Sequence, residues 1–329
     1  SFNITKLNTA IKALKKENEQ LLKDLAKKYI KFMKNKENIL IIKHGALGDL
    51  IQADGIFKSI RANHKNTKIF LLTTNSFFSL METCPHIDDV LIDNRPSILN
   101  IISYINLYKK IIKFNFKVIY DLQNSQRTYI YRKYLFNNTK WISTNRKDHP
   151  ISGLRGLEDM MKENLIGSKI FKPDLSWLSG DIEKLLKKNE IQSKYVVLLP
   201  GSSKSNPLKR WPYFSKLAKL LVLKGHEVVT ILGPEELEIE NLMVGHILKN
   251  LDWHELSGVI ENSCFIVGND SGPSHIASCL NKKGFALFGP STSAKRSELK
   301  RGNFEILEVK DLKLLSADEV LKKIMKVLN

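Results

Sequence analysis

The segment 264–277 most constrains how this chain folds, because an apolar run there ends abruptly in small and polar residues. The run Cys264–Val267 is typical of a buried strand. Gly272 suits the N-cap of a following helix, and Pro273 suits its first position, where a missing N–H costs nothing. A helix N-terminus offers free N–H groups and the positive end of a dipole. Unless it is an ordinary strand-to-helix turn, the segment predicts an anion site.

The residues of this turn suit a phosphate group in particular. Ser271, Gly272 and Ser274 are small enough for a phosphate to approach the backbone closely. Asp270 and His275 stand where they can orient it.

A second apolar run, Val196–Leu199, also opens into small residues and then a helix that Gly225 ends. Ser202 and Ser203 offer hydroxyl and amide donors after this strand. Lys209, just before the helix, supplies a charge that could neutralise a departing phosphate. The alternative for Lys209 is a solvated surface lysine.

A third run, Asn38–Ile42, has the continuous apolar character of a buried parallel strand and turns into a helix through Lys43–Asp49. The glycines there do not form G-x-G-x-x-G, and no acidic residue closes a following strand at the distance expected for a ribose, so dinucleotide binding is not favoured. Asp49 either projects into a cleft above the strand ends as a catalyst or caps the helix, and both readings stay open.

Apolar strands alternate with amphipathic helices along the chain, which predicts an α/β fold with parallel sheets. Pro173 and the polar run 176–194 are the expected linker between two halves, and Ser316–Glu319 is a capping box for a last helix to Leu328. The expected strands are Ile39–Lys43, Lys68–Thr73, Val90–Ile92, Val118–Asp121, Val196–Leu199, Glu227–Leu232, Cys264–Val267 and Phe285–Phe288.

Together these segments resemble the heptosyltransferases, glycosyltransferase family 9. The resemblance runs from about Asn38 to Pro290 in the order expected for the family. Its motifs are Lys43–Asp49, Asp121–Gln123, Pro200–Ser203 with Lys209–Pro212, and Gly268–His275 with Phe288–Pro290.

The resemblance implies a GT-B architecture, in which two Rossmann-like domains with parallel sheets face each other across a cleft. The acceptor then lies mainly on the first domain and the nucleotide sugar on the second. The expected parts are an amphipathic helical extension (1–37), the acceptor domain (38–173), the nucleotide-sugar domain (174–310) and a C-terminal helix (311–329). Whether that helix crosses back onto the first domain is left open.

The resemblance further implies an inverting, metal-independent enzyme without a cofactor, which moves heptose from ADP-heptose to the inner core of lipopolysaccharide. Asp49 matches the catalytic base, Lys209 and the two helix turns stabilise the departing diphosphate, and Glu235 holds the nucleoside. The implied donor contacts are Ser202, Ser203, Lys209, Glu235, Asp270, Ser271, Gly272 and His275.

The acceptor site is less defined. Many family members carry His three residues after the catalytic Asp, where this chain has Gln52, so the acceptor's identity stays open. Positive charge is dense after the fourth expected strand, at the edge where open α/β sheets bind ligands. The acceptor candidates are Gly48, Gln52, Asn124, Arg127 and Arg146.

The chain carries a formal net charge of +18, which attracts polyanions or an anionic membrane surface. No helix-turn-helix, zinc-finger or RNP-type signature accompanies the charge, so a phosphorylated, lipid-linked oligosaccharide fits better than nucleic acid. Two rival functions remain: a GT-B sugar-nucleotide epimerase or hydrolase, and a basic polyanion-binding protein without catalysis.

The three cysteines show no metal-ligand spacing, and we expect no metal site. A signal peptide and a bilayer-spanning run are not evident, which favours the cytoplasm and the inner face of the inner membrane. In the N-terminal 37 residues, apolar residues at three- and four-residue spacing predict a helix that packs on the first domain, lies on the membrane or pairs with its copy. The oligomeric state stays open.

Overall fold

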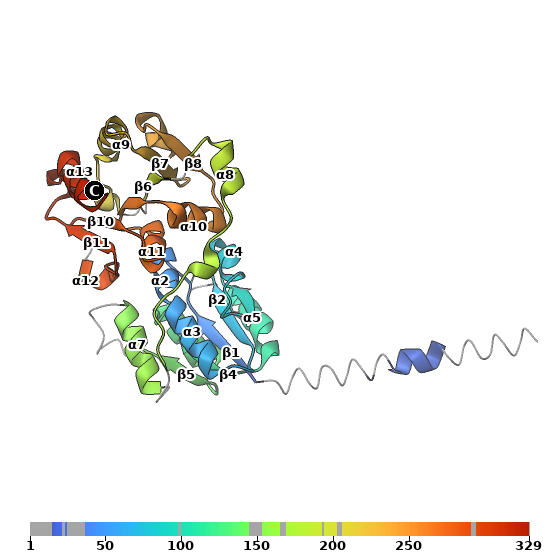
Figure 1. The fold of residues 1–329 in the computed structure, drawn as a ribbon. Helices are drawn as coiled ribbons and strands as arrows, with labels where there is room; N and C mark the ends of the chain where they lie inside the picture. The colour runs from blue at the N-terminus through green and yellow to red at the C-terminus, as the bar shows by residue number, and fades with distance from the viewer. Residues whose placement is uncertain are drawn as a thin grey trace, which may run out of the picture.

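The structure is a computed structural model that describes residues 15–21, 24, 37–97, 100–144, 153–164, 169–192, 194–202, 206–290 and 294–328. Two α/β domains follow one another along the chain, and helices of the two domains meet between the sheets (Figure 1). The α/β class with parallel sheets, expected from the alternation of strands and helices, is confirmed.

The first sheet has the order β3-β2-β1-β4-β5, and all its neighbours pair in parallel. β1 is buried along its whole length, because helices cover both faces of the sheet. Ile39 and Ile41 belong to the core on one face, and Leu40 and Ile42 to the core on the other. The strands are β1 (Asn38–Ile42), β2 (Ile69–Thr73), β3 (Asp89–Ile92), β4 (Phe116–Asp121) and β5 (Lys140–Ser143).

The helices of the first domain divide between these two faces (Figure 1). One face carries α2 (Leu47–Gln52), α3 (Asp54–Asn63) and α7 (Gly153–Asn164). The other carries α5 (Ile101–Ile111) and, packed beside it, α6 (Gln126–Ile130) with its continuation η3 (Tyr131–Leu135). Short helices η1 (Asn75–Phe77), α4 (Phe78–Met81) and η2 (Ile112–Phe114) complete this domain.

The second sheet, read from the other edge, has the order β8-β7-β6-β9-β10-β11, again all parallel. This is the strand order of a doubly wound Rossmann fold. Its strands are β6 (Tyr195–Leu199), β7 (Glu227–Leu232), β8 (His246–Lys249), β9 (Phe265–Asn269), β10 (Gly284–Phe288) and β11 (Phe304–Glu308). The sequence did not predict β5, β8 and β11, which lie at sheet edges and are only partly buried.

The C-terminal helix α13 (Ala317–Leu328) stays on the second domain, so the alternative that it crosses to the first domain is wrong. Val320 and Ile324 share an apolar core with α9 (Phe214–Leu223). The predicted capping box is present, because Glu319 accepts from Ser316 and donates to it through its backbone N–H. The opposite face of the sheet carries α10 (Trp253–Asn262) and α11 (Gly272–Cys279), and the other short helices are η5 (Pro207–Lys209), η6 (Leu237–Leu242), α12 (Ala294–Ser297) and η7 (Leu312–Leu314).

The run expected to be a polar linker is an ordered connection. It contains η4 (Ser176–Leu178) and α8 (Glu183–Lys188), and it buries Leu178 and Ile182. Asp54 of the first domain anchors it by accepting from the backbone N–H of Asp174 at 2.9 Å and from the Trp177 indole at 3.0 Å. Burial raises the pKa of Asp54 to about 6, although these hydrogen bonds oppose the rise.

The strand order of each sheet reverses at one point, between β1 and β4 in the first and between β6 and β9 in the second. Open α/β sheets bind ligands in the crevice at the carboxyl end of such a switch point. The helices that follow β1 and β9, α2 and α11, pack against each other, so the two switch points face one another.

Candidate functional site

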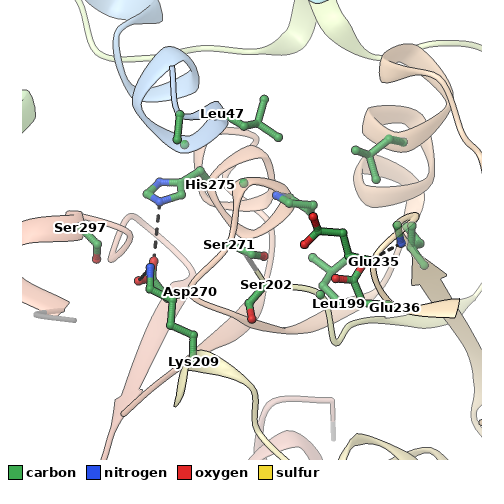
Figure 2. Close-up of a pocket in the computed structure, with 18 of the residues that line it drawn as sticks. Leu47, Leu199, Ser202, Lys209, Glu235, Glu236, Asp270, Ser271, His275 and Ser297 are labelled. Atoms are coloured by element: carbon green, nitrogen blue, oxygen red, sulfur yellow. Dashed lines mark hydrogen bonds and ion pairs between the residues drawn. The ribbon is translucent and has the colours of Figure 1, made fainter. Parts of the chain in front are cut away.

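A cleft of about 1540 Å³ lies between the two domains. The loops after β1, β6, β7 and β9 line it. β1, β6 and β9 are central strands of their sheets, and β7 lies next to β6. Figure 2 shows Lys209 and Asp270 on one side of this cleft, Glu235 and Glu236 on the other, and Ser202 and Ser271 between them. The three segments singled out in the sequence therefore meet at one site.

Asp49 lies in the first turn of α2, and its side chain is 52% exposed at the cleft. One carboxylate oxygen accepts from the Ala46 backbone N–H at 3.2 Å, so the residue does cap its helix. Because the rest of the carboxylate remains open to the cleft, capping and a second role are compatible.

Lys43 lies close to Asp49 and contacts the residue that follows β4. Its ammonium donates to the Leu122 carbonyl at 3.3 Å and lies 3.9 Å from the carboxylate of Asp49. Burial lowers the pKa of Lys43, and the carboxylates of Asp49 and Asp121 oppose that change. The amine of Lys43 thus faces Asp49 from the residue that follows β1.

The turn after β9 differs from its prediction by one residue. Ser271 is the N-cap and Gly272 is the first residue of α11, because the backbone of Ser271 is extended. Asn269, fully buried, donates to the Pro200 carbonyl at 2.7 Å and accepts from the Trp211 backbone N–H at 3.1 Å. This side chain ties together the two turns predicted to bind phosphate.

Asp270 lies between two potential cations. The Lys209 ammonium is 2.7 Å from one of its oxygens, and Nε2 of His275 is 3.9 Å from the other. Burial lowers the pKa of His275, while Asp270 and Asp49 oppose that shift only in part, so the ring is neutral at pH 7. Lys209 therefore carries the positive charge of this group.

The helices on either side of the domain boundary approach each other through glycine. A Cβ on Gly48 would lie 2.5 Å from Cδ2 of His275, and a Cβ on Gly272 would lie 2.3 Å from Cδ2 of Leu47. Gly48 and Gly272 thus bring α2 and α11 together, a role that the sequence analysis did not assign to them.

Glu236 is a residue that the sequence analysis missed. It is buried, accepts from the Gly233 backbone N–H at 3.0 Å and pairs with Arg210 at 3.5 Å. Arg210 also donates to the hydroxyl of Ser202 at 3.3 Å, so it links the loops after β6 and β7. Glu235 is exposed and lines the cleft, whereas its neighbour holds the loop. Because Glu235 and Glu236 are adjacent and chemically identical, the sequence alone could not show which of them lines the cleft and which holds the loop.

Ser202 is buried and lines the cleft. Ser203 and Arg146 lie outside the described residues.

The acceptor candidates in the described part of the first domain make contacts within the protein. Gln52 is buried and donates to the carbonyl of Ser297 in α12, across the domain boundary. Asn124 donates to the Thr144 carbonyl at 2.8 Å. Arg127, an acceptor candidate, is largely covered: its side chain is 12% exposed, donates to the Pro96 carbonyl and lies over the Tyr104 ring.

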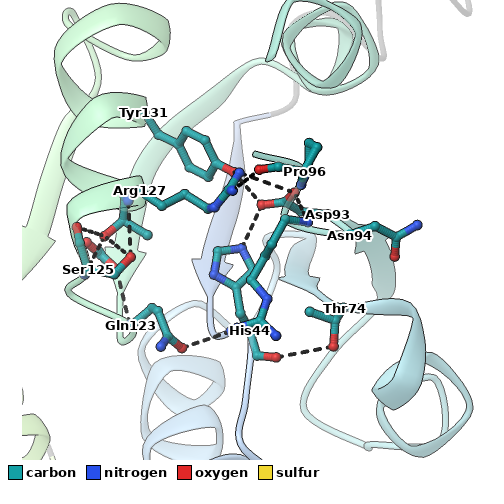
Figure 3. Close-up of polar contacts among 12 residues, drawn as sticks. His44, Thr74, Asp93, Asn94, Pro96, Gln123, Ser125, Arg127 and Tyr131 are labelled. Carbon is teal, nitrogen blue, oxygen red and sulfur yellow. Dashed lines mark hydrogen bonds and ion pairs between the residues drawn. The ribbon is translucent and has the colours of Figure 1, made fainter. Parts of the chain in front are cut away.

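Arg127 belongs to a buried network that the sequence analysis did not foresee (Figure 3). Asp93 lies at its centre, 2.9 Å from Nε2 of His44, and accepts from the Tyr131 hydroxyl. His44 in turn accepts from Thr74 at 3.3 Å through its carbonyl oxygen. His44 also donates through its backbone N–H to Gln123 at 3.0 Å. The network therefore fixes the loops after β1, β2, β3 and β4, and the first of these leads to Asp49 in α2.

Comparisons with known proteins agree with this geometry. The sequence profile of glycosyltransferase family 9 (heptosyltransferase) matches residues 166–311. Lipopolysaccharide heptosyltransferase 1 of Campylobacter coli is 24% identical over 298 residues, which are 79% of this chain and 86% of that protein. The family match and this relative together support the assignment of this chain to the heptosyltransferase family.

Solved heptosyltransferases share the fold. Escherichia coli ADP-heptose lps heptosyltransferase II has a TM-score of 0.72 at 17% identity, over 88% of this chain and 98% of that one. An E. coli heptosyltransferase with ADP-2-deoxy-2-fluoro heptose has a TM-score of 0.68 at 15% identity, over 88% and 99% of the two chains. The predicted GT-B architecture is confirmed.

The comparisons bear on the functions left open by the sequence. This heptosyltransferase-family protein is a glycosyltransferase, so the non-catalytic polyanion-binding alternative is set aside. Among the described residues, no cluster of three or more His, Cys, Asp or Glu side chains is arranged to hold a metal ion.

Proposed function

We propose that this protein transfers heptose from ADP-heptose to the inner core of a lipopolysaccharide acceptor. The observation that carries the proposal is the position of Asp49, whose half-exposed carboxylate opens from the first domain into a cleft lined by Lys209 and both phosphate turns of the second. The names of the similar proteins, which mention lipopolysaccharide, ADP-heptose and an ADP-heptose analogue, support the choice of substrates.

In this proposal Asp49 is the general base. It takes the proton of the acceptor hydroxyl as that oxygen attacks the anomeric carbon, and the bond between that carbon and the diphosphate breaks on the opposite face. A single displacement of this kind inverts the configuration at the anomeric carbon. The Ala46 N–H and the Lys43 ammonium hold the carboxylate in place during the reaction.

The terminal phosphate of the leaving ADP gains one negative charge when its bond to the anomeric carbon breaks, and Lys209 and the N-terminus of α11 stabilise that charge. Asp270 positions the Lys209 ammonium before the donor arrives. Glu235 accepts hydrogen bonds from the nucleoside, and Ser202, Ser203, Ser271, Gly272 and His275 complete the donor site. These groups supply charge stabilisation without a metal, so transfer should persist in EDTA.

The acceptor is anchored in lipid, so we place the enzyme at the inner face of the cytoplasmic membrane. None of the helices in the described segments combines the length and apolar character needed to cross a bilayer. A peripheral attachment, aided by the net charge of +18, is the arrangement we propose.

A panel of nucleotides tests the donor. A ligand that binds the native state stabilises it by RT ln(1 + [L]/Kd), so the melting temperature should rise with ADP and ADP-heptose and little with UDP or GDP. Transfer of heptose to a purified acceptor, followed by mass spectrometry, tests the reaction itself. Stabilisation by UDP in place of ADP, or hydrolysis of the donor without transfer, would contradict the proposal.

A further inference from the structure

One surface of the first domain combines exposed apolar side chains with positive charge. Ile101 and Ile102 in the first turn of α5 are 69% and 72% exposed, and Ile105 on α5 and Ile112 at the start of η2 are also exposed. Tyr129 and Tyr134 are exposed on α6 and η3, which pack beside α5 through Tyr104 and Tyr131. We call these four isoleucines and two tyrosines the isoleucine face.

The segment that forms the isoleucine face is rich in lysine and arginine and poor in acidic residues. Between residues 100 and 140 the chain has Asp121 as its sole acidic residue, and that side chain is buried. The exposed cations of the segment are Lys109, Lys110, Lys113, Lys117, Arg132, Lys133 and Lys140, of which Lys117 pairs with Glu37 at 2.9 Å. Isoleucine and tyrosine interleaved with lysine form the pattern of a surface that lies in the interface of an anionic bilayer.

The isoleucine face begins at the edge of the domain that forms the cleft. β3 ends at Ile92 and β4 at Asp121, so α5 and α6 both start at the carboxyl edge of the sheet, where the loop of Asp49 also lies. A bilayer in contact with the start of α5 would hold a lipid anchor beside the cleft while the sugar reached Asp49.

The chain's own N-terminal segment is a poorer occupant. Residues 1–37 contain ten lysines and four acidic residues, so their charge has the same sign as that around the isoleucine face. A second copy of the domain would likewise bring lysines against lysines. Charge complementarity therefore favours a bilayer with anionic headgroups over either of these partners.

We propose that the isoleucine face docks on the anionic lipid surface that holds the acceptor, an inference that rests on the proposed function. The isoleucines and tyrosines enter the headgroup region, and the lysines and arginines contact lipid phosphates. Docking orients the cleft toward the membrane and needs no conformational change in the protein.

Sedimentation of the full chain with vesicles tests this surface. Vesicles that contain phosphatidylglycerol should bind the protein at least about tenfold more tightly than phosphatidylcholine vesicles, and added salt should reduce the difference. The double variant Ile102→Asp/Ile105→Asp should lower binding about tenfold or more. Leu223→Asp is the matched control, since Leu223 is 81% exposed on the second domain, and it should bind like the wild type.

Two further measurements separate the possible failures. ADP should raise the melting temperature of the double variant as it does that of the wild type, which shows that the variant is folded. Transfer to a deacylated, soluble acceptor should be equal in both proteins, whereas transfer to acceptor in vesicles should fall in the variant. Loss of transfer by the wild type in both assays would instead overturn the proposed function.

The proposal is overturned if the double variant binds anionic vesicles like the wild type, or if the wild type does not distinguish the two lipids. A dimer in light scattering that Ile102→Asp/Ile105→Asp converts to monomer, without vesicle binding by the wild type, would assign the isoleucine face to a second copy.

Discussion

The two domains share a strand order around their centres but use the carboxyl edges of their sheets differently. In the second domain this edge is open: Lys209, Ser202 and Ser271 line a cleft. In the first domain the corresponding edge is filled by a buried network around Asp93, above which Asp49 opens to the cleft.

The difference follows from what each edge has to do. In the proposed reaction a charged donor needs cations and N–H groups that can reach its phosphates, and the second domain has such groups at the surface of the cleft. The proposed general base needs a fixed position, and the polar groups of the first domain hold the loops around it. The same strand order thus gives an open edge that lines the cleft in the second domain and an edge held by buried polar contacts in the first.

The largest expected effect tests the first domain's edge. Asp93→Ala removes the partner of His44 and Tyr131 in a site where Asp93 is only 3% exposed. Breaking such a buried pair should lower the free energy of unfolding by about 3–5 kcal/mol, measured by chemical denaturation. Glu305→Ala breaks an exposed pair with Lys300 and should cost less than about 1 kcal/mol. If both variants lost less than about 1 kcal/mol of unfolding free energy, the network would not hold the loops of the first domain in place.

The connection between the domains should respond to pH through Asp54. Its pKa is raised from 3.8 to about 6 in the folded state, so between these values the folded protein holds a proton that the unfolded chain has lost. The free energy of unfolding therefore falls as pH rises through this window, by up to about 3 kcal/mol for this group. Asp54→Asn should remove that component in denaturation curves at pH 4, 5, 6 and 7. If the free energy of unfolding changed with pH in the same way in the wild type and in Asp54→Asn, Asp54 would not have the raised pKa.

The second domain's edge should show a smaller and more selective effect. Lys209→Ala should weaken ADP binding by about 10- to 100-fold in calorimetry, the usual worth of a charged hydrogen bond, and leave adenosine binding nearly unchanged. Lys216→Ala, which breaks a 2.6 Å ion pair with Asp318 outside the cleft, is the control.

The pair of Lys209 with Asp270 requires one more variant. Lys209→Ala leaves the Asp270 carboxylate without its 2.7 Å partner, and that charge would itself repel a diphosphate. If Lys209→Ala/Asp270→Asn regains full ADP affinity, repulsion explains the loss and Lys209 is not a phosphate contact.

The sequence predicted the centres of both sheets well, because strands buried on both faces read as continuous apolar runs. It missed the edge strands β5, β8 and β11, which are only partly buried and therefore lack that run. The polar stretch taken for a linker contains α8, since a helix with only part of its surface buried reads as polar.

The candidate site shows the same division. Motifs placed Asp49, Lys209 and Asp270 at one cleft, because each residue follows the carboxyl end of a central parallel strand. The network of Asp93 and the anchoring role of Glu236 depend on contacts between residues far apart in the chain, and no local pattern marks them. For the same reason the sequence did not show that Arg127, an acceptor candidate, is part of this network.

The central claim is that Asp49 is the base for transfer across the cleft, and Asp49→Asn tests it most directly. The amide keeps the size and the helix cap of Asp49 but cannot take a proton. We predict that kcat for heptose transfer falls by roughly 10²- to 10⁴-fold, with the affinity for ADP-heptose and the melting temperature nearly unchanged. Near-normal turnover together with a lower melting temperature would show that Asp49 only caps its helix, and would contradict the account.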